Sequence, residues 1–303
     1  MDHHKGHVPV LTREVVRLLC GSGRRASCVV DCTVGLGGHA AELLRAGKGE
    51  GCLIGMDADA SNLRLAKRGL QPFGPRVRLF EANFADLPDV LAEAGLDGAD
   101  AIVADLGVAS VQLDDPGRGF SFAAEGPLDM RLDRRQRRTA ADLVSALGER
   151  ELADLIFEYG QERYSRRIAR AIVRARRAGP IATTTALAEI IQRAVPAGAR
   201  RTRRGVHPAT RTFQALRIAV NDELRNLDRL LAALPEALNV GGRACVISFH
   251  SLEDGRVKRA FADWSATGRA KLVTKKPVTA GKDERAENPR SRSAKLRCVE
   301  RIG

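Results

Sequence analysis

The residues Cys28 to His39, C-V-V-D-C-T-V-G-L-G-G-H, form the strongest local pattern in this chain of 303 residues. A short run of apolar β-formers ends at Asp31, passes through several glycines and leads into a helical pattern over residues 40–45. Glycines let the backbone turn sharply and approach a ligand, while the free N–H groups of the first helical turn point at it. Asp31, at the carboxyl end of the strand, is placed where open α/β sheets bind ligands.

Two cofactors suit such a loop. A dinucleotide suits it because Gly35, Gly37 and Ala40 satisfy G-x-G-x-x-G/A. Asp57 also ends the next apolar run about 20 residues on, where a ribose-binding acid is expected. S-adenosylmethionine suits it because this cofactor has a ribose but no phosphate, so that an acid at the end of the first strand can reach its cationic amino group. Asp31 favours S-adenosylmethionine, and the dinucleotide remains the alternative.

The composition indicates a polyanionic partner. The chain has 50 Lys+Arg against 37 Asp+Glu, a formal net charge of +13, while aromatic residues make up only 4%. No apolar run approaches the ~18 residues of a membrane span, and the first residues lack the apolar centre of a signal peptide, so we expect a cytoplasmic protein without a membrane partner. The six cysteines are scattered without a C-x-x-C pair, so we expect core residues and no metal site.

Strand and helix signals alternate after the glycine loop. Strands are predicted over residues 53–57, 77–81 and 101–105, and helices over 60–70 and 87–94. This alternation predicts an α/β fold with a parallel sheet covered by helices on both faces. Phe84 and Asp86 follow the third strand, where they can contact an adenine or simply form a packed turn. Asp105 ends the fourth strand opposite Asp31, where reacting groups meet, and Gln112 follows it.

The chain changes character near residue 115. Helices are predicted over residues 140–147, 149–159, 162–177 and 185–194, so we expect an inserted all-α domain over 115–207 within a core of residues 1–114 and 208–303. The insert is rich in arginine, which is typical of phosphate contacts, although charge alone does not separate RNA from DNA. The predicted nucleic-acid contacts are Arg131, Arg134, Arg135, Arg166, Arg167, Arg170, Arg201, Arg203 and Arg204.

The remaining residues return to the core. A long helix is predicted over residues 213–231, a fifth strand over 243–249, and a terminal strand pair over 272–276 and 294–302. His250 follows the fifth strand, where it can contact a substrate or make a structural hydrogen bond. Asp254 lies one helical turn further on.

Eight strings in order carry a resemblance to a known family: G-H-V-P-V-L at Gly6, D-C-T-V-G-L-G-G-H at Asp31, D-L-G-V-A-S-x-Q-L-D-D at Asp105, R-G-F-S-F at Arg118, G-P-L-D-M-R at Gly126, H-P-A-T-R-T-F-Q-A-L-R-I at His207, I-S-F-H-S-L-E-D at Ile247 and A-E-N-P-R-S-R-S at Ala286. The chain resembles the bacterial 16S ribosomal RNA cytosine-N4 methyltransferases, the RsmH or MraW family, over nearly its whole length. One departure follows the fifth strand, where G-R-V-K at Gly255 replaces the usual R-I-V-K and leaves the role of Arg256 open.

The resemblance implies a class I methyltransferase fold with a mostly parallel seven-stranded sheet and a helical insertion. It implies S-adenosyl-L-methionine as the donor, S-adenosyl-L-homocysteine as the product, and a decoding-region cytidine of 16S rRNA, within the small ribosomal subunit, as the acceptor. It also suggests a homodimer. The cofactor positions of the family correspond to Gly37, Gly38, His39, Asp57, Phe84, Asp105 and Gln112, to which the pattern of the loop adds Asp31 and Gly35.

The chemistry agrees with amine methylation. A cytosine N4 amine is a poor nucleophile but needs no covalent adduct, whereas carbon-5 methylation needs a cysteine thiolate, and no cysteine has a convincing loop context here. We expect Asp105 to accept a hydrogen bond from the amine, with His250 and Asp254 as weaker catalytic candidates. The alternatives are a methyltransferase acting on another RNA and an RNA-binding module without catalysis.

Overall fold

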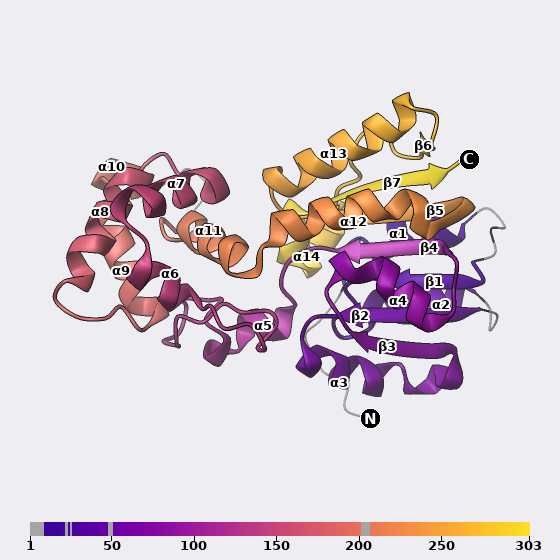
Figure 1. The fold of residues 1–303 in the computed structure, drawn as a ribbon, viewed down its shortest axis with the longest axis horizontal. Coiled ribbons are helices and arrows are strands. Elements are labelled where there is room, and N and C mark those ends of the chain that lie inside the picture. Colours follow the sequence, from indigo (N-terminus) through magenta and orange to yellow (C-terminus); the bar gives the residue numbers. More distant parts are fainter. Residues whose placement is uncertain (1–8, 22–23, 25, 48–50, 201–206) are drawn as a thin grey trace. The chain divides into compact units, whose positions relative to one another are not determined.

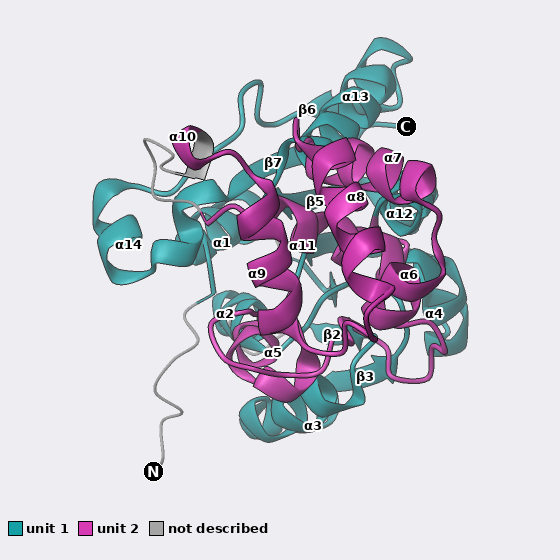
Figure 2. Ribbon diagram, turned by 90° about the vertical axis from the view of Figure 1, so that its left-hand side faces the viewer, with its two compact units in different colours: residues 1–107, 224–303 teal, residues 108–223 magenta. Residues whose placement is uncertain are grey.

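The computed structural model describes residues 9–21, 24, 26–47, 51–200 and 207–303 (Figure 1). These residues form two compact units (Figure 2). Unit 1 comprises residues 1–107 and 224–303, and unit 2 comprises residues 108–223. The candidate cofactor loop therefore belongs to unit 1, and most of the candidate arginines belong to unit 2.

Unit 1 contains one seven-stranded sheet with the strand order β3-β2-β1-β4-β5-β7-β6. The strands are β1 (Cys28–Asp31), β2 (Cys52–Asp57), β3 (Val77–Glu81), β4 (Ala99–Asp105), β5 (Leu238–Ser248), β6 (Ala270–Leu272) and β7 (Lys295–Arg301). The first five are parallel, and β7 runs antiparallel to both β5 and β6. The predicted mostly parallel sheet is confirmed, although β6 ends at Leu272, where the predicted strand began.

Helices cover both faces of this sheet. On one face lie α4 (Leu87–Ala94), α12 (Glu223–Ala237) and α13 (Ser251–Ala266); on the other lie α1 (Thr12–Cys20), α2 (Gly38–Ala46) and α3 (Ala60–Gly69). Successive strand residues alternate between the two cores, as in β1, where Val30 joins the first and Val29 the second. Both faces are buried, which explains why the strands read as continuous apolar runs. The two short segments α14 (Lys282–Glu287) and η4 (Pro289–Ser293) complete the unit.

Unit 2 is helical and has a core of its own. Its elements are α5 (Ser110–Asp114), η3 (Pro116–Arg118), α6 (Ala140–Ala146), α7 (Glu149–Gly160), α8 (Ser165–Arg176), α9 (Thr184–Ala194), α10 (Ala197–Arg200) and α11 (Thr210–Asn221). Leu143, Ile156, Ile168, Leu187 and Leu216 each expose 1% or less and come from five of these helices. A self-contained core explains why this segment can be inserted between two strands.

The boundaries of the insertion differ from the prediction of residues 115–207. The predicted helix over residues 213–231 is two helices, because the backbone turns left-handed at Asp222, with φ 51°. Phe213 and Leu216 of α11 are buried in the core of unit 2, so this helix belongs to the insertion. Beyond the break, Glu223 pairs with Arg217 at 2.8 Å. The insertion therefore extends from Val108 to Glu223.

In the described part of the chain, no helix is both long and apolar enough to cross a membrane. All six cysteines carry free thiols, and Cys28, Cys32, Cys245 and Cys298 are buried as expected of core residues.

Candidate functional site

Three aspartates mark one edge of the sheet in unit 1. Asp31, Asp57 and Asp105 are the last residues of β1, β2 and β4, which are neighbouring parallel strands. The carboxyl ends of parallel strands lie at the same edge, so the predicted grouping of these three side chains is confirmed. Each carboxylate has a different environment, and the difference determines what each can do.

The glycine loop between β1 and α2 needs its glycines. Gly35 and Gly37 adopt left-handed φ angles of 53° and 87°. A Cβ on Gly37 would lie 3.0 Å from Leu70 Cγ, and one on Gly38 would lie 2.8 Å from Pro9 Cγ. Gly37 immediately precedes the first turn of α2, whose N–H groups lack partners within the helix. The loop can thus bring backbone donors close to a ligand, as predicted.

Asp57 holds this loop to the sheet. Its Oδ2 accepts the Gly35 N–H at 3.0 Å, and its Oδ1 accepts the Asp59 N–H at 2.8 Å. The Asn62 amide contacts both oxygens at 3.2–3.3 Å. Burial raises the pKa of Asp57 to about 6, although these hydrogen bonds oppose the increase. Asp57 therefore shapes the loop directly, in addition to any ribose contact.

Asp31 has an unpaired oxygen. Its Oδ1 accepts the Thr33 N–H at 3.1 Å, but its Oδ2 is buried and has no hydrogen-bond partner among the described residues. Burial raises the pKa of Asp31 to about 6, and the nearby Asp105 and Asp57 add to this, while His39 opposes it. A buried carboxylate oxygen without a donor is costly, so this atom suits a ligand that brings a cationic N–H group.

Asp105 is the second carboxylate with an unpaired oxygen. Thr33 Oγ1 accepts the Asp105 N–H at 2.7 Å, which ties the end of β4 to the end of β1. Within the described part of the chain, Asp105 Oδ1 has no hydrogen-bond partner. Its Oδ2 lies 3.5 Å from His39 Nε2, and the carboxylate is 20% exposed. Oδ1 itself is buried, like the unpaired oxygen of Asp31, so it suits a ligand that brings an N–H donor.

The predicted adenine contacts lie at the same edge. Phe84 belongs to η2 (Phe84–Asp86), is half-buried and packs against the sheet core. Asn83 Oδ1 accepts the Ala85 N–H at 2.9 Å and so fixes this turn. Asp86 pairs with Arg229 at 3.1 Å and so joins η2 to α12. Phe84 remains a prediction for adenine contact.

Gln112 belongs to unit 2, whereas the three aspartates belong to unit 1. It is 3% exposed, and its Oε1 accepts the Ala109 N–H at 2.9 Å at the start of α5. This contact caps a short helix. Its predicted role beside the cofactor stays a prediction.

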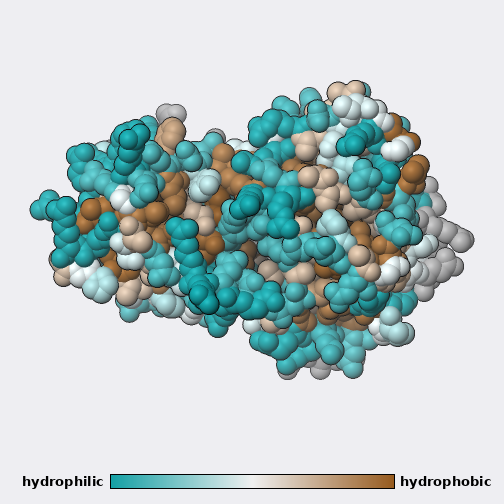
Figure 3. Space-filling view, viewed as in Figure 1, coloured by the Kyte–Doolittle hydropathy of each residue, from teal (hydrophilic) through white to brown (hydrophobic). Residues whose placement is uncertain are grey.

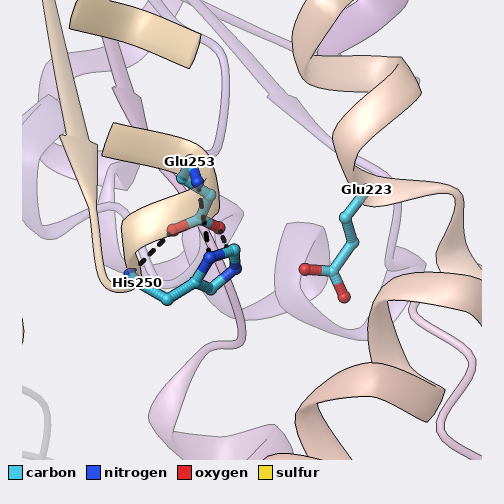
Figure 4. A group of neighbouring side chains, drawn as sticks. All are labelled: Glu223, His250 and Glu253. Atoms are coloured by element: carbon cyan, nitrogen blue, oxygen red, sulfur yellow. Dashed lines mark hydrogen bonds and ion pairs between the residues drawn. The ribbon is translucent and has the colours of Figure 1, made fainter. Parts of the chain in front are cut away.

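His250 caps the helix that follows β5 (Figure 4). Its Nδ1 accepts the Glu253 N–H at 3.4 Å, while Glu253 Oε2 accepts the Phe249 N–H at 2.8 Å. Glu253 Oε2 also accepts the His250 N–H at 3.3 Å, and this bond together with the Nδ1 contact forms a capping box at the start of α13. Nε2 lies 3.2 Å from Glu253 Oε1, so the imidazole is held against its own helix. The structural interpretation accounts for Nδ1, whereas Nε2 is buried without a hydrogen-bond partner among the described residues, so the predicted catalytic role of His250 stays a prediction.

Asp254 does not reach the reacting edge with a free carboxylate. It pairs with Arg297 at 2.7 Å and with Lys295 at 3.0 Å, both from β7. Burial would raise the pKa of Asp254, but hydrogen bonds from Arg297 and Lys295 outweigh it and keep the pKa below its ordinary value. Asp254 therefore joins α13 to β7, and its predicted catalytic role stays a prediction.

Arg256, the residue at the departure from the family pattern, also has a structural role. Its Nε lies 3.1 Å from Asp228 of α12, and its Nη1 donates to the Leu252 carbonyl at 3.2 Å. It links α12 and α13, two of the helices that cover one face of the sheet.

Some candidate arginines pair with neighbouring groups of the protein, whereas others are exposed. Arg131 donates to both oxygens of Asp129 and to the Gln136 carbonyl, so it stabilises its own turn, and its predicted RNA contact stays a prediction. Arg135 pairs with Asp133 at 2.9 Å, whereas Arg134 is exposed. Arg201, Arg203 and Arg204 lie outside the described residues.

Helix α8 presents its arginines along one side. Arg166, Arg170 and Arg174 follow one another at intervals of four residues, and with Arg167 they are all exposed. The opposite side, with Ile168 and Ile172, is buried in the core of unit 2. Arg170 pairs with Glu149 at 3.2 Å. Hydrophilic side chains gather on the surface in the region of α8 (Figure 3).

The sequence pattern missed two residues at the aspartate edge. Thr33 joins β1 to β4, and Asn62 supports Asp57 from α3. Asn62 follows Asp57 by five residues and is 3% exposed, so a polar residue at a buried helical position was the available signal. Thr33 gave no signal beyond its place in the loop.

Comparisons with known proteins identify the family of this chain. Residues 4–302 match the model of the MraW methylase family. The chain is 50% identical to the ribosomal RNA small subunit methyltransferase H of Citrifermentans bemidjiense, covering 99% of each chain. It is 50% identical to the protein of that name from Symbiobacterium thermophilum (98% of this chain, 96% of the relative) and 47% identical to that of Syntrophobacter fumaroxidans (98% and 97%).

A solved structure gives a weaker likeness. The crystal structure of an rRNA methylase from Streptococcus thermophilus is 10% identical, with a TM-score of 0.42 over 96% of this chain and 94% of the other. That value carries no argument about function. The family match over residues 4–302 and the relatives at 50% identity show that the chain belongs to the MraW methylase family.

Proposed function

We propose that this protein transfers the methyl group of S-adenosylmethionine to the N4 amine of a specific cytidine in 16S rRNA of the small ribosomal subunit. The observation that carries the proposal is the match to a methylase family over residues 4–302. Relatives named ribosomal RNA small subunit methyltransferase H, about half identical over their full length, support the class of substrate. The choice of cytosine N4 rests on the resemblance and on the chemistry below.

The residues at the aspartate edge fit this cofactor. Asp31 offers a buried, unpaired oxygen for the ammonium of the methionine part, and the first turn of α2 offers N–H groups without partners within the helix. Asp57 still has accepting capacity for the ribose hydroxyls, and Phe84 offers a ring for the adenine. A dinucleotide fits less well, because a buried carboxylate at Asp31 would face its pyrophosphate.

When bound, S-adenosylmethionine supplies an electrophilic methyl group. The lone pair of a cytosine amine is delocalised into the ring, so the protein must hold the base out of its stack and in line for attack. Asp105 Oδ1, unpaired in the described structure, can accept a hydrogen bond from the amine and stabilise the positive charge that develops on nitrogen. The N–H proton becomes acidic only as the new N–C bond forms. Deprotonation before attack is therefore not required.

The exposed arginines of unit 2 are proposed as contacts for the RNA backbone. Arg166, Arg167 and Arg174 have no acidic partner among the described residues and lie along about 12 Å of helix α8. Arg134 and Arg170 are further candidates. Because these contacts involve phosphates, they position the RNA without reading its sequence.

The test is transfer of labelled methyl from S-adenosylmethionine to small subunits, and to naked 16S rRNA, from cells lacking this protein. Nucleoside mass spectrometry should then find N4-methylcytidine at one position. Transfer to another base or another RNA would overturn the acceptor assignment. Binding of RNA without any transfer, despite bound S-adenosylmethionine, would favour a binding module instead.

A further inference from the structure

The imidazole of His39 is buried without hydrogen bonds. His39 is the second residue of α2 and is 5% exposed. Neither Nδ1 nor Nε2 has a hydrogen-bond partner among the residues that the structure describes. A buried histidine that packs only for shape normally satisfies at least one ring nitrogen. These two nitrogens therefore need another explanation.

Three carboxylates surround this ring. Asp105 of β4 is the nearest, with its Oδ2 3.5 Å from His39 Nε2, and Asp31 of β1 lies within electrostatic range. The third is Glu284 of α14, whose Oε1 accepts the Leu11 N–H at 2.6 Å. Asp31 and Asp105 each keep one oxygen without a hydrogen-bond partner among the described residues, and both lie near His39 at the edge proposed to hold the cofactor.

We propose that His39 is a positioning residue whose imidazolium is the counter-charge of Asp31 and Asp105 and holds Asp31 in the ionised form that the cofactor ammonium needs. The inference rests on the proposed function and assigns this role to the side chain of His39. It is additional to the cofactor contact that the family resemblance implies for this position.

The charges favour this assignment. Without a cation, the buried Asp31 beside the carboxylate of Asp105 would take up a proton more readily. Burial would lower the pKa of His39, but Asp105, Asp31 and Glu284 outweigh it and raise the pKa above its ordinary value. In turn, His39 lowers the pKa of Asp31 against the larger effect of burial. With His39 protonated, Asp31, Asp105 and His39 carry one net negative charge, which matches the single net positive charge of S-adenosylmethionine.

The inference predicts a pH dependence with a definite sign. Asp31 must be ionised to bind the cofactor ammonium, so affinity falls as the pH drops through its pKa. Replacing His39 by a neutral residue raises that pKa and moves the loss of affinity to higher pH. Above the pKa of His39 the wild-type ring is itself neutral, so wild type and variant should converge. A merely structural role would weaken binding equally at every pH.

The first experiment needs no ligand. The imidazole of His39 is titrated by NMR in the free protein and in the Asp105→Asn variant. We expect titration above the ordinary histidine range in wild type and a decrease of about one pH unit or more in the variant. An ordinary titration that Asp105→Asn leaves unchanged would overturn the inference, even for an active methyltransferase. This experiment uses no His39 variant, so its result does not depend on whether such a variant folds.

The second experiment measures S-adenosylhomocysteine affinity from pH 5 to 9 for wild type and His39→Gln, with His207→Gln as the control. His207 lies in unit 2, where its Nδ1 accepts only a backbone N–H at 3.1 Å. We expect His39→Gln to bind about tenfold more weakly near pH 6.5 and within about twofold of wild type at pH 9. A pH-independent loss in His39→Gln would refute the inference. Absence of binding in wild type would refute the proposed cofactor, leaving the NMR result as the separate test of the charge coupling.

Discussion

Replacing Asp31 by asparagine should stabilise the free protein while removing its cofactor affinity. Asp31 is 1% exposed, and its pKa is raised from 3.8 to about 6. A raised carboxyl pKa means that the ionised group costs stability in the folded state. The cost is absent below the pKa of the unfolded chain, grows as the pH rises between the two values, and is complete above about pH 6.

The difference of roughly two pKa units corresponds to about 3 kcal/mol, at 1.36 kcal/mol per unit. Asparagine keeps an acceptor for the Thr33 N–H but carries no charge. We therefore expect Asp31→Asn to raise the free energy of unfolding of the free protein by up to about 3 kcal/mol at pH 8, and by almost nothing near pH 4.

Unfolding is followed by the fluorescence of Trp264, the single tryptophan, which lies in α13 and reports on unit 1. Denaturant series at pH 4, 6 and 8 give the free energies, and titration with S-adenosylhomocysteine gives the affinity. Saturating ligand should stabilise wild type but not the variant. A variant that is less stable than wild type at pH 8, or whose gain is the same at every pH, would show that burial of the Asp31 charge is not the cause.

Three further outcomes follow from particular contacts. Gly37→Ala should lower cofactor affinity at least about tenfold, since the left-handed φ of 87° and the contact with Leu70 oppose a side chain. Isothermal titration measures this affinity, and an unchanged value would show that the loop does not belong to the cofactor site. Replacing Arg166, Arg167 and Arg174 by glutamine should reduce the salt dependence of RNA affinity, −dlogK/dlog[salt], by about 2. Replacement of Arg193, which pairs with Glu189 at 2.9 Å, is the control. A slope equal to that of wild type in the triple variant would exclude α8 from the RNA contacts. Asp254→Asn should destabilise unit 1 by about 2 kcal/mol at neutral pH, because it weakens the pairing of the buried Arg297. Since the pKa of Asp254 is lowered, this loss should fade as the pH falls through the carboxyl range, and a loss independent of pH would point to packing instead.

The sheet and its ligand edge were predictable because they depend on short-range patterns. A strand is recognised by four to six apolar residues, and the alternation of strands with helices leaves little choice but a parallel sheet. Once the sheet is parallel, Asp31, Asp57 and Asp105 must share an edge, since each ends a strand. The glycine positions follow from the same local pattern, because a left-handed φ is a property of the single residue.

The roles of individual side chains depended on contacts between distant parts of the chain. Asp254 finds its partners more than 40 positions away on an antiparallel strand, and Asp105 meets His39 across 66 positions. The helix from residue 213 to 231 reads as continuous, yet it breaks at Asp222 because α11 is buried in the core of unit 2. Local periodicity specifies which residues are buried, whereas the identity of the group facing each one depends on how the elements pack.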